Sequence, residues 1–131
     1  MSTFNAIGVA GTGVTVYRKW LDAVSDNIAN IDNVSRTSED AFQARYVVAQ
    51  EAQDGNGAQV GGIAYGSAEG KLSYEPDNPL AHTEGYVPRP DIDLGSQMAQ
   101  MIMAQRAYQA NLSVVDRARD SYTAAINLGK G

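Results

Sequence analysis

Glycines cluster near the start of the chain, where residues 8–13 read Gly-Val-Ala-Gly-Thr-Gly. Glycine-rich loops bind nucleotide phosphates when they follow a strand and open a helix. Here the order is G-x-x-G-x-G and no strand pattern precedes it, so neither the dinucleotide-binding fingerprint nor the phosphate-binding loop fits. Because each glycine costs about 1 kcal/mol relative to alanine within a helix, we interpret the segment as a flexible entry into a helix.

Histidine, cysteine and grouped carboxylates are the other side chains that commonly carry chemistry. His82 is the only histidine and the chain has no cysteine, so the sequence offers no spaced set of zinc ligands. Asp91, Asp93 and Gly95 are similar to part of a calcium loop, but the glycine comes one residue early and no glutamate closes the site. Capping of a helix is the preferred interpretation of these aspartates. We therefore expect no enzyme activity, no metal site and no cofactor.

Charge and length limit the classes of function further. The 131 residues carry a net charge of -5. The ten basic residues, spread from Arg18 to Lys130, form no cationic stripe that could neutralise a phosphate backbone, so nucleic acid is not an expected partner. No run approaches the roughly 18 apolar residues that cross a bilayer. Residues 1–16 lack the basic region and apolar core of a cleavable secretory signal. We expect no direct membrane insertion and no cleaved signal peptide.

Apolar residues that recur at every third or fourth position predict one helix at each end of the chain. The first helix is expected to end near Asn33, with its seam at Ile7, Ala10, Val14, Tyr17, Leu21, Val24, Ile28 and Ile31. The second is expected over 94–128, with its seam at Leu94, Met98, Met101, Tyr108, Leu112, Val115, Tyr122 and Ile126. Gln105 and Arg119 fill the two seam positions that are not apolar. Chain ends are usually poorly ordered. Apolar seams at both ends therefore predict a subunit whose terminal helices pack against neighbouring subunits.

The middle of the chain has a different pattern. Alternating residues predict a strand over 41–49, and Asp-Gly-Asn-Gly at 54–57 predicts a hairpin turn. Short apolar pieces at 60–67 and 72–74 complete two or three small antiparallel strands. All four prolines lie within 75–90, which predicts a stiff extended connection because proline disfavours helix and inner strand.

The predicted fold class is therefore α+β. Long N- and C-terminal helices pack as a coiled-coil-like pair, with a small antiparallel β module and a Pro-rich extended segment between them. The predicted division is an N-terminal axial helix over 1–33, the β module and its connection over 34–93, and a C-terminal axial helix over 94–131. Residues 1–13 are expected to be flexible in the free chain.

Three motifs in sequence order resemble one protein family. Leu21–Asn30 (LDAVSDNIAN) resembles the S-x-N-(I/L)-A-N signature of bacterial flagellar rod and hook proteins, and Met103–Asn111 (MAQRAYQAN) resembles their R-x-Y-x-A-N helix motif. Tyr74–Ala81 (YEPDNPLA), with Gly85–Val87 and Pro90–Asp93, resembles the proximal rod type of this basal-body rod family. The resemblance covers nearly the whole chain. It departs after the first motif, where the family often has Thr and a G-(Y/F) pair.

The resemblance implies a structural subunit of the proximal rod that polymerises through its terminal helices into the torque-transmitting drive shaft for motility. Its implied partners are further copies of itself, other proximal and distal rod proteins, rod-base adaptor subunits and the flagellar type III export apparatus. Its implied location is the periplasmic rod of the basal body, reached without a cleaved signal peptide. The expected assembly interface comprises Val14, Tyr17, Leu21, Val24, Asn27, Ile28, Asn30, Met98, Met101, Arg106, Tyr108, Asn111, Leu112, Val115, Tyr122 and Ile126.

Four members of this interface are polar, namely Asn27, Asn30, Arg106 and Asn111. We expect them to fix the register of the helices, because buried amide and guanidinium groups accept few partner geometries. Two alternatives stay open from the sequence. One is an intracellular coiled-coil binding module, which requires a stable free helical hairpin. The other is a rod or adaptor component of a related type III secretion device.

Overall fold

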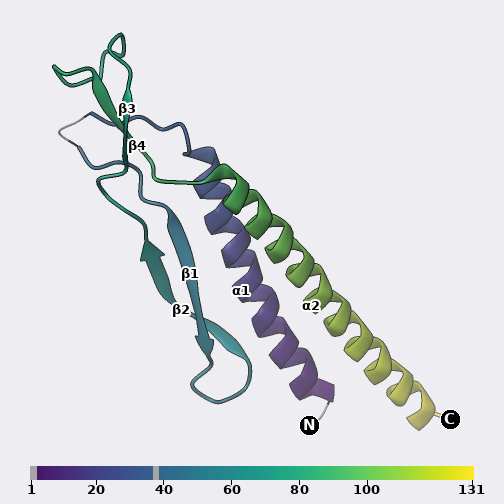
Figure 1. Ribbon diagram of the computed structural model, residues 1–131. Coiled ribbons are helices and arrows are strands. Elements are labelled where there is room, and N and C mark those ends of the chain that lie inside the picture. The colour runs from purple at the N-terminus through teal and green to yellow at the C-terminus, as the bar shows by residue number, and fades with distance from the viewer. Residues whose placement is uncertain (1–2, 37–38) are drawn as a thin grey trace. The chain divides into compact units, whose positions relative to one another are not determined.

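A computed structural model describes residues 3–36 and 39–131 (Figure 1). Its elements are α1 (Thr3–Ala29), β1 (Arg45–Glu51), β2 (Ala58–Tyr65), β3 (Lys71–Tyr74), β4 (Tyr86–Arg89) and α2 (Leu94–Gly129). Strand β1 pairs with β2, and β3 pairs with β4. Two long packed helices with two small antiparallel hairpins between them in sequence confirm the predicted α+β class.

Contacts divide the chain into two compact units. Unit 1 comprises Met1–Leu21, Val47–Gly62 and Ile102–Gly131, and unit 2 comprises Asp22–Tyr46 and Ile63–Met101. Each unit thus contains part of α1, part of α2 and strand residues. The predicted division into 1–33, 34–93 and 94–131 follows the order of elements along the chain, and it stays a prediction.

Helix α1 ends at Ala29, earlier than the predicted end near Asn33. The Asn30 side chain donates from Nδ2 to the Asp26 carbonyl at 2.8 Å, which is the competition for backbone acceptors that disfavours asparagine inside helices. The amides of Ile31 and Asn33 bond three residues back, at 3.3 and 3.0 Å, so the chain tightens into turns. At the other end the helix begins at Thr3, and residues 1–2 lie outside the described residues. Flexibility of residues 1–13 in the free chain stays a prediction.

Helix α2 begins where the sequence places its cap. Of the two candidate aspartates, Asp93 is the cap, because its Oδ2 accepts a hydrogen bond of 2.8 Å from the Ser96 amide. Asp91 instead forms an ion pair with Lys71, with 2.8 Å between Nζ and Oδ1. The capped helix continues to Gly129.

The β1–β2 hairpin has the predicted turn but shifted strands. Gly55 and Gly57 have φ values of 71° and 105°, and the Ala52 amide donates to the Gly57 carbonyl at 3.0 Å. The predicted strand over 41–49 is wrong at its start, since β1 begins at Arg45. Residues 41–44 reach the facing chain only through separate hydrogen bonds, such as the 2.8 Å bond from the Ala41 amide to the Ala68 carbonyl, without forming a continuous ladder.

Strand β4 was not predicted, because it contains Pro88 and lies within the segment expected to be a stiff connection. It pairs with β3 in antiparallel register, with Leu72 opposite Pro88 and Tyr74 opposite Tyr86. A two-stranded sheet has only edge strands, and an edge strand tolerates a proline. Residues 75–85 are also folded rather than extended, since backbone hydrogen bonds close successive turns there. The prolines of this segment therefore lie beside turns, and they do not make the segment a stiff extended connection.

Candidate assembly site

The helix faces that pack inside the subunit are offset from the predicted seams. On α2 the inward positions are Gln97, Met101, Ala104, Tyr108, Asn111, Val115, Ala118 and Tyr122, all buried or half-buried. On α1 the most buried residues are Ala10, Val16, Ala23, Val24 and Asn27. The α2 face keeps the expected spacing of three and four, but small and polar residues occupy every second position. These small residues let the helices approach closely.

The side chain of Asn27 is fully buried and makes polar contacts in unit 2. Its Nδ2 donates to the Arg45 carbonyl at 2.9 Å and to Gln97 Oε1 at 3.0 Å, and its Oδ1 accepts from the Arg45 amide at 2.7 Å. The side chain is 0% exposed, and Gln97 is 2% exposed. The Asn27 side chain thus satisfies the backbone amide and carbonyl of Arg45, as a neighbouring strand would. It also bonds to Gln97 of α2. A buried network of this kind is specific because an unmatched partner leaves polar groups unsatisfied.

In unit 1 the two helices meet where Gly13 faces Asn111. A Cβ atom on Gly13 would lie 2.9 Å from Asn111 Oδ1 and 3.2 Å from its Cγ. Asn111 donates from Nδ2 to the Ala107 carbonyl of its own helix at 3.1 Å. The start of α1 also contacts the end of α2, where the rings of Phe4 and Tyr122 lie 4.5 Å apart, edge to face. The helices therefore run antiparallel in this unit, and the missing side chain of Gly13 permits their approach.

The tip of the β1–β2 hairpin is attached to α1 through Thr12. Its hydroxyl donates to the Val9 carbonyl at 2.6 Å and accepts from the Ala58 amide at 3.1 Å. Gly57 lies against this hydroxyl with φ of 105°, and a Cβ there would collide with Thr12 Oγ1. Within the glycine-rich start of the chain, Thr12 and Gly13 therefore contact other segments of unit 1, whereas a Cβ on Gly8 or Gly11 would meet no atom within 4 Å.

A pocket of about 370 Å³ lies within unit 1. Its lining consists of Gly13, Val16, Tyr17, Trp20, Val47, Ala49, Ala58 and Asn111. The lining is mainly apolar, and its polar side-chain groups are those of Tyr17, Trp20 and Asn111. Its chemistry suits contact with an apolar side chain.

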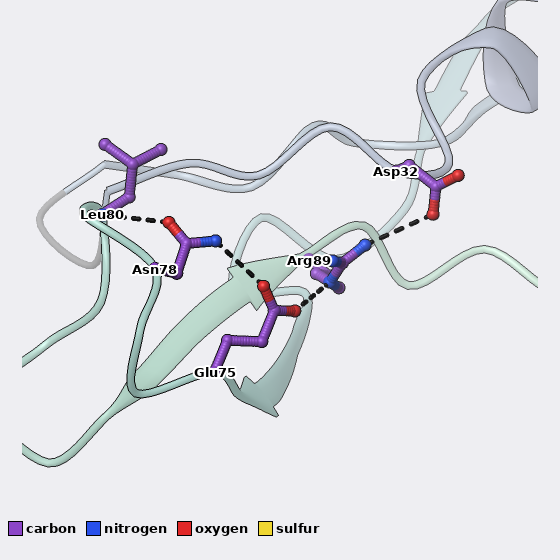
Figure 2. Close-up of polar contacts among 5 residues, drawn as sticks. All are labelled: Asp32, Glu75, Asn78, Leu80 and Arg89. Atoms are coloured by element: carbon purple, nitrogen blue, oxygen red, sulfur yellow. Dashed lines mark hydrogen bonds and ion pairs between the residues drawn. The ribbon is translucent and has the colours of Figure 1, made fainter.

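A second polar cluster organises the Tyr74–Ala81 motif in unit 2 (Figure 2). Arg89 donates from Nε to Glu75 Oε1 at 2.6 Å and lies 3.3 Å from Asp32 Oδ1. Asn78 donates from Nδ2 to the other Glu75 oxygen at 2.9 Å, and its Oδ1 accepts from the Leu80 amide at 3.0 Å. The hydrogen bond from Arg89, followed by that from Asn78, lowers the pKa of Glu75 to about 2. The cluster ties the turns after β3 and after α1 to strand β4.

Comparison with known proteins gives full-length relatives. A family model described as the C-terminal part of flagellar basal body rod FlgEFG proteins matches residues 83–128. The flagellar basal-body rod protein FlgC of Salmonella typhimurium is 32% identical, across 99% of this chain and 100% of the relative. FlgC of Borreliella burgdorferi is 30% identical across 100% of both chains, and FlgC of Bacillus subtilis is 25% identical across 99% of this chain and 100% of the relative. The chain belongs to the flagellar basal-body rod protein family.

Membership in the flagellar basal-body rod family confirms the resemblance found in the sequence motifs. The family is structural rather than enzymatic, and the chain is a structural subunit of the basal-body rod that assembles with other rod components. Within residues 3–36 and 39–131 no group of three histidine, aspartate or glutamate side chains is placed to hold a metal ion. Among the same residues, no helix combines the length and apolarity needed to span a membrane.

The expected interface residues of this rod protein fall into two sets. Half-buried or buried within the subunit are Val14, Tyr17, Leu21, Val24, Asn27, Ile28, Asn30, Met101, Tyr108, Asn111, Val115 and Tyr122. Exposed are Met98, Arg106, Leu112 and Ile126. Gln97, Gly13 and Thr12 were not predicted as site residues. Gln97 could have been found from the sequence, because it shares a second spacing of three and four with Ala104 and Asn111, beside the predicted seam.

Proposed function

We propose that this rod subunit belongs to the proximal rod, as its FlgC relatives and the Tyr74–Ala81 motif suggest, and that it polymerises through its terminal helices to transmit torque. In this proposal it binds further copies of itself, other rod proteins and rod-base adaptor subunits. The flagellar type III export apparatus delivers it to the periplasm without cleavage of a signal peptide.

The observation that carries the proposal is an apolar row on α2 that the subunit leaves uncovered. Leu94, Met98, Ile102 and Leu112 are 45%, 54%, 51% and 37% exposed. Three of them are members of the predicted seam. Exposed apolar rows on a long helix favour association with other helices, and helical assembly offers one subunit several neighbours.

Mass spectrometry of purified hook and basal-body particles tests the location of the chain. We expect the chain to stay with the particles after soluble proteins are washed away, in company with other rod proteins. Particles that contain the other rod proteins but lack this chain would contradict the proposal.

Replacement of Leu112 by Asp tests the role of the apolar row. We expect motility in soft agar to fall to that of a strain without the gene, because a carboxylate cannot be buried in an apolar helix contact without a large desolvation cost. Ala99→Asp introduces the same charge at another exposed position of α2 and should leave motility nearly unchanged. Full motility of the Leu112→Asp strain would show that the apolar row is not part of the assembly interface.

A further inference from the structure

The two units of the chain differ strongly in charge. Unit 1 has six lysines and arginines against four carboxylates, which gives a net charge of +2. Unit 2 has four lysines and arginines against eleven carboxylates, which gives -7. Together they account for the -5 of the whole chain. The net charge is therefore the sum of a basic part and a strongly acidic part.

Ion pairs inside unit 2 increase this difference in available charge, because three of its four basic side chains are already paired with its own carboxylates. Arg45 pairs with Asp26 at 2.8 Å, Lys71 with Asp91 at 2.8 Å, and Arg89 with Glu75 at 2.6 Å. Seven exposed carboxylates make no ion pair within the part of the chain that the structure describes. They are Asp22, Glu39, Asp40, Glu69, Asp77, Glu84 and Asp93. Unit 2 therefore presents negative charge that its own cations do not neutralise.

Unit 1 presents the opposite charge on one face of α2. Met103, Arg106, Ala110, Val114 and Arg117 follow each other at spacings of three and four, so they lie on one stripe of the helix. Met103 and Val114 are 56% and 49% exposed, and both arginines are exposed. Neither arginine has a carboxylate partner among residues 3–36 and 39–131. We call these five residues the arginine stripe.

Unit 2 carries a surface of matching chemistry on the β3–β4 hairpin. Leu72, Tyr74 and Tyr86 are exposed, and the two tyrosine rings lie 5.2 Å apart across the strands. The connection between the tyrosines bears the unpaired Asp77 and Glu84. We call these five residues the tyrosine face. Arginine side chains pair with carboxylates and also stack on tyrosine rings, so the tyrosine face offers both kinds of contact.

The tyrosine face is held in place before any partner binds. The Glu75–Arg89–Asn78 cluster fixes the start of the connection (Figure 2). Gly85, at φ of 82°, lies so close to Tyr74 that a Cβ would be 2.9 Å from its ring. A surface fixed in this way loses little conformational freedom on binding, which favours affinity.

We infer that copies of this chain associate head to tail, with the arginine stripe of one copy on the tyrosine face of the next. The inference rests on the proposed rod function and names one contact within it. The two surfaces differ, so the contact is heterologous, and such contacts build open helical filaments when they do not close into a ring. Charge steers the contact, and the apolar members of both surfaces contribute burial.

Sedimentation velocity of the full purified chain over a concentration series tests the contact. We expect self-association at about 10 mM salt, where the screening length is about 30 Å, and its loss at about 1 M salt, where that length is about 3 Å. Arg106→Glu with Arg117→Glu should weaken association by about tenfold, because two attractive charges become repulsive. Arg106→Gln with Arg117→Gln should give an intermediate loss. Arg18→Glu with Lys19→Glu changes the net charge equally on α1 and should have a much smaller effect.

Mixing two variants gives the sharper test. Asp77→Lys with Glu84→Lys reverses the tyrosine face and should also weaken self-association. A mixture of this variant with Arg106→Glu/Arg117→Glu should associate again, because each altered surface then meets an opposite charge on the other protein. Circular dichroism confirms that each variant is folded before mixing. Two folded variants that fail to associate in the mixture overturn the head-to-tail contact.

The test separates this inference from the proposed function. A chain that is present in basal-body particles but does not self-associate at low salt keeps its rod function and loses the head-to-tail contact. Binding of the arginine stripe only to another purified rod protein also overturns the inference, since the partner is then not a second copy. Absence from the particles contradicts the proposed function itself, whatever the sedimentation result.

Discussion

Units 1 and 2 both place an asparagine of a family motif where α1 meets α2, but they use it differently. In unit 2, Asn27 is fully buried and joins a strand to the opposite helix through three hydrogen bonds. In unit 1, Asn111 is half-buried, and among the described residues its side chain bonds only to the backbone of its own helix. It faces Gly13 and lines a pocket of about 370 Å³. At this helix contact, unit 2 therefore satisfies its asparagine with partners on other elements, whereas unit 1 leaves an open pocket beside its asparagine.

This difference indicates which unit depends more on neighbouring subunits. Glycine within a helix lowers helix stability, and α1 has Gly8, Gly11 and Gly13 in the part that belongs to unit 1. A loosely packed region with weak intrinsic helix preference becomes ordered when partners add contacts. We therefore expect unit 1 to depend on assembly more than unit 2 does.

Asn27→Ala should give the largest effect on stability. It leaves the amide and carbonyl of Arg45 and the side chain of Gln97 without their partner, and each unsatisfied buried group costs about 1–3 kcal/mol. We expect the free energy of unfolding to fall by about 3 kcal/mol, measured by urea unfolding of the purified chain. Asn111→Ala is the matched control and should change stability by less than about 1 kcal/mol. Equal losses for the two variants would mean that the units do not differ as described.

Gly13→Ala should give a smaller effect that reports on the contact in unit 1. Alanine stabilises a helix by about 1 kcal/mol relative to glycine, and Gly8→Ala should show this gain because no atom lies within 4 Å of the added Cβ. At Gly13 the added Cβ meets Asn111, so we expect most of the gain to disappear. Thermal unfolding of Gly13→Ala in an Asn111→Ala background should recover it. Equal gains at Gly8 and Gly13 in the wild-type background would show that the helices do not approach there.

The fold could be predicted from sequence to the level of its elements. Periodic apolar residues predicted both helices, and Asp93 was one of two predicted caps. Strand β4 could not be predicted, because the rule that excludes proline applies to inner strands and the sequence does not reveal that Pro88 lies in a two-stranded sheet. The end of α1 was placed too late because the Asn30 side chain ends the helix before the apolar pattern stops.

The α2 seam shows the limit of sequence analysis at the site. Met101, Tyr108 and Val115 fit two overlapping seams, which differ in the residues between them. The predicted seam takes large apolar residues such as Leu112, whereas the packed face takes Ala104 and Asn111. Hydrophobicity favours the predicted seam with its large apolar residues. The packed face was missed because small residues, which suit close packing of two helices, are weakly hydrophobic. Asn27 was predicted because its motif marked it, while its partner Gln97 had no motif.

The pH dependence of unfolding tests the polar cluster of unit 2 and should be the smallest of these effects. The pKa of Glu75 is lowered from 4.5 to about 2 by Arg89 and Asn78, so between these values the unfolded chain binds more protons than the folded chain. Stability from this carboxylate is therefore complete above pH 4.5 and is lost as the pH falls towards 2. We expect urea unfolding between pH 7 and pH 3 to show a shallower decline for Glu75→Gln than for the wild type. Asp77→Asn removes a charge from the same connection, where no ion pair holds it among the described residues, and should keep the wild-type slope. A wild-type slope for Glu75→Gln would show that the Arg89 cluster does not contribute to the stability of unit 2 through this charge.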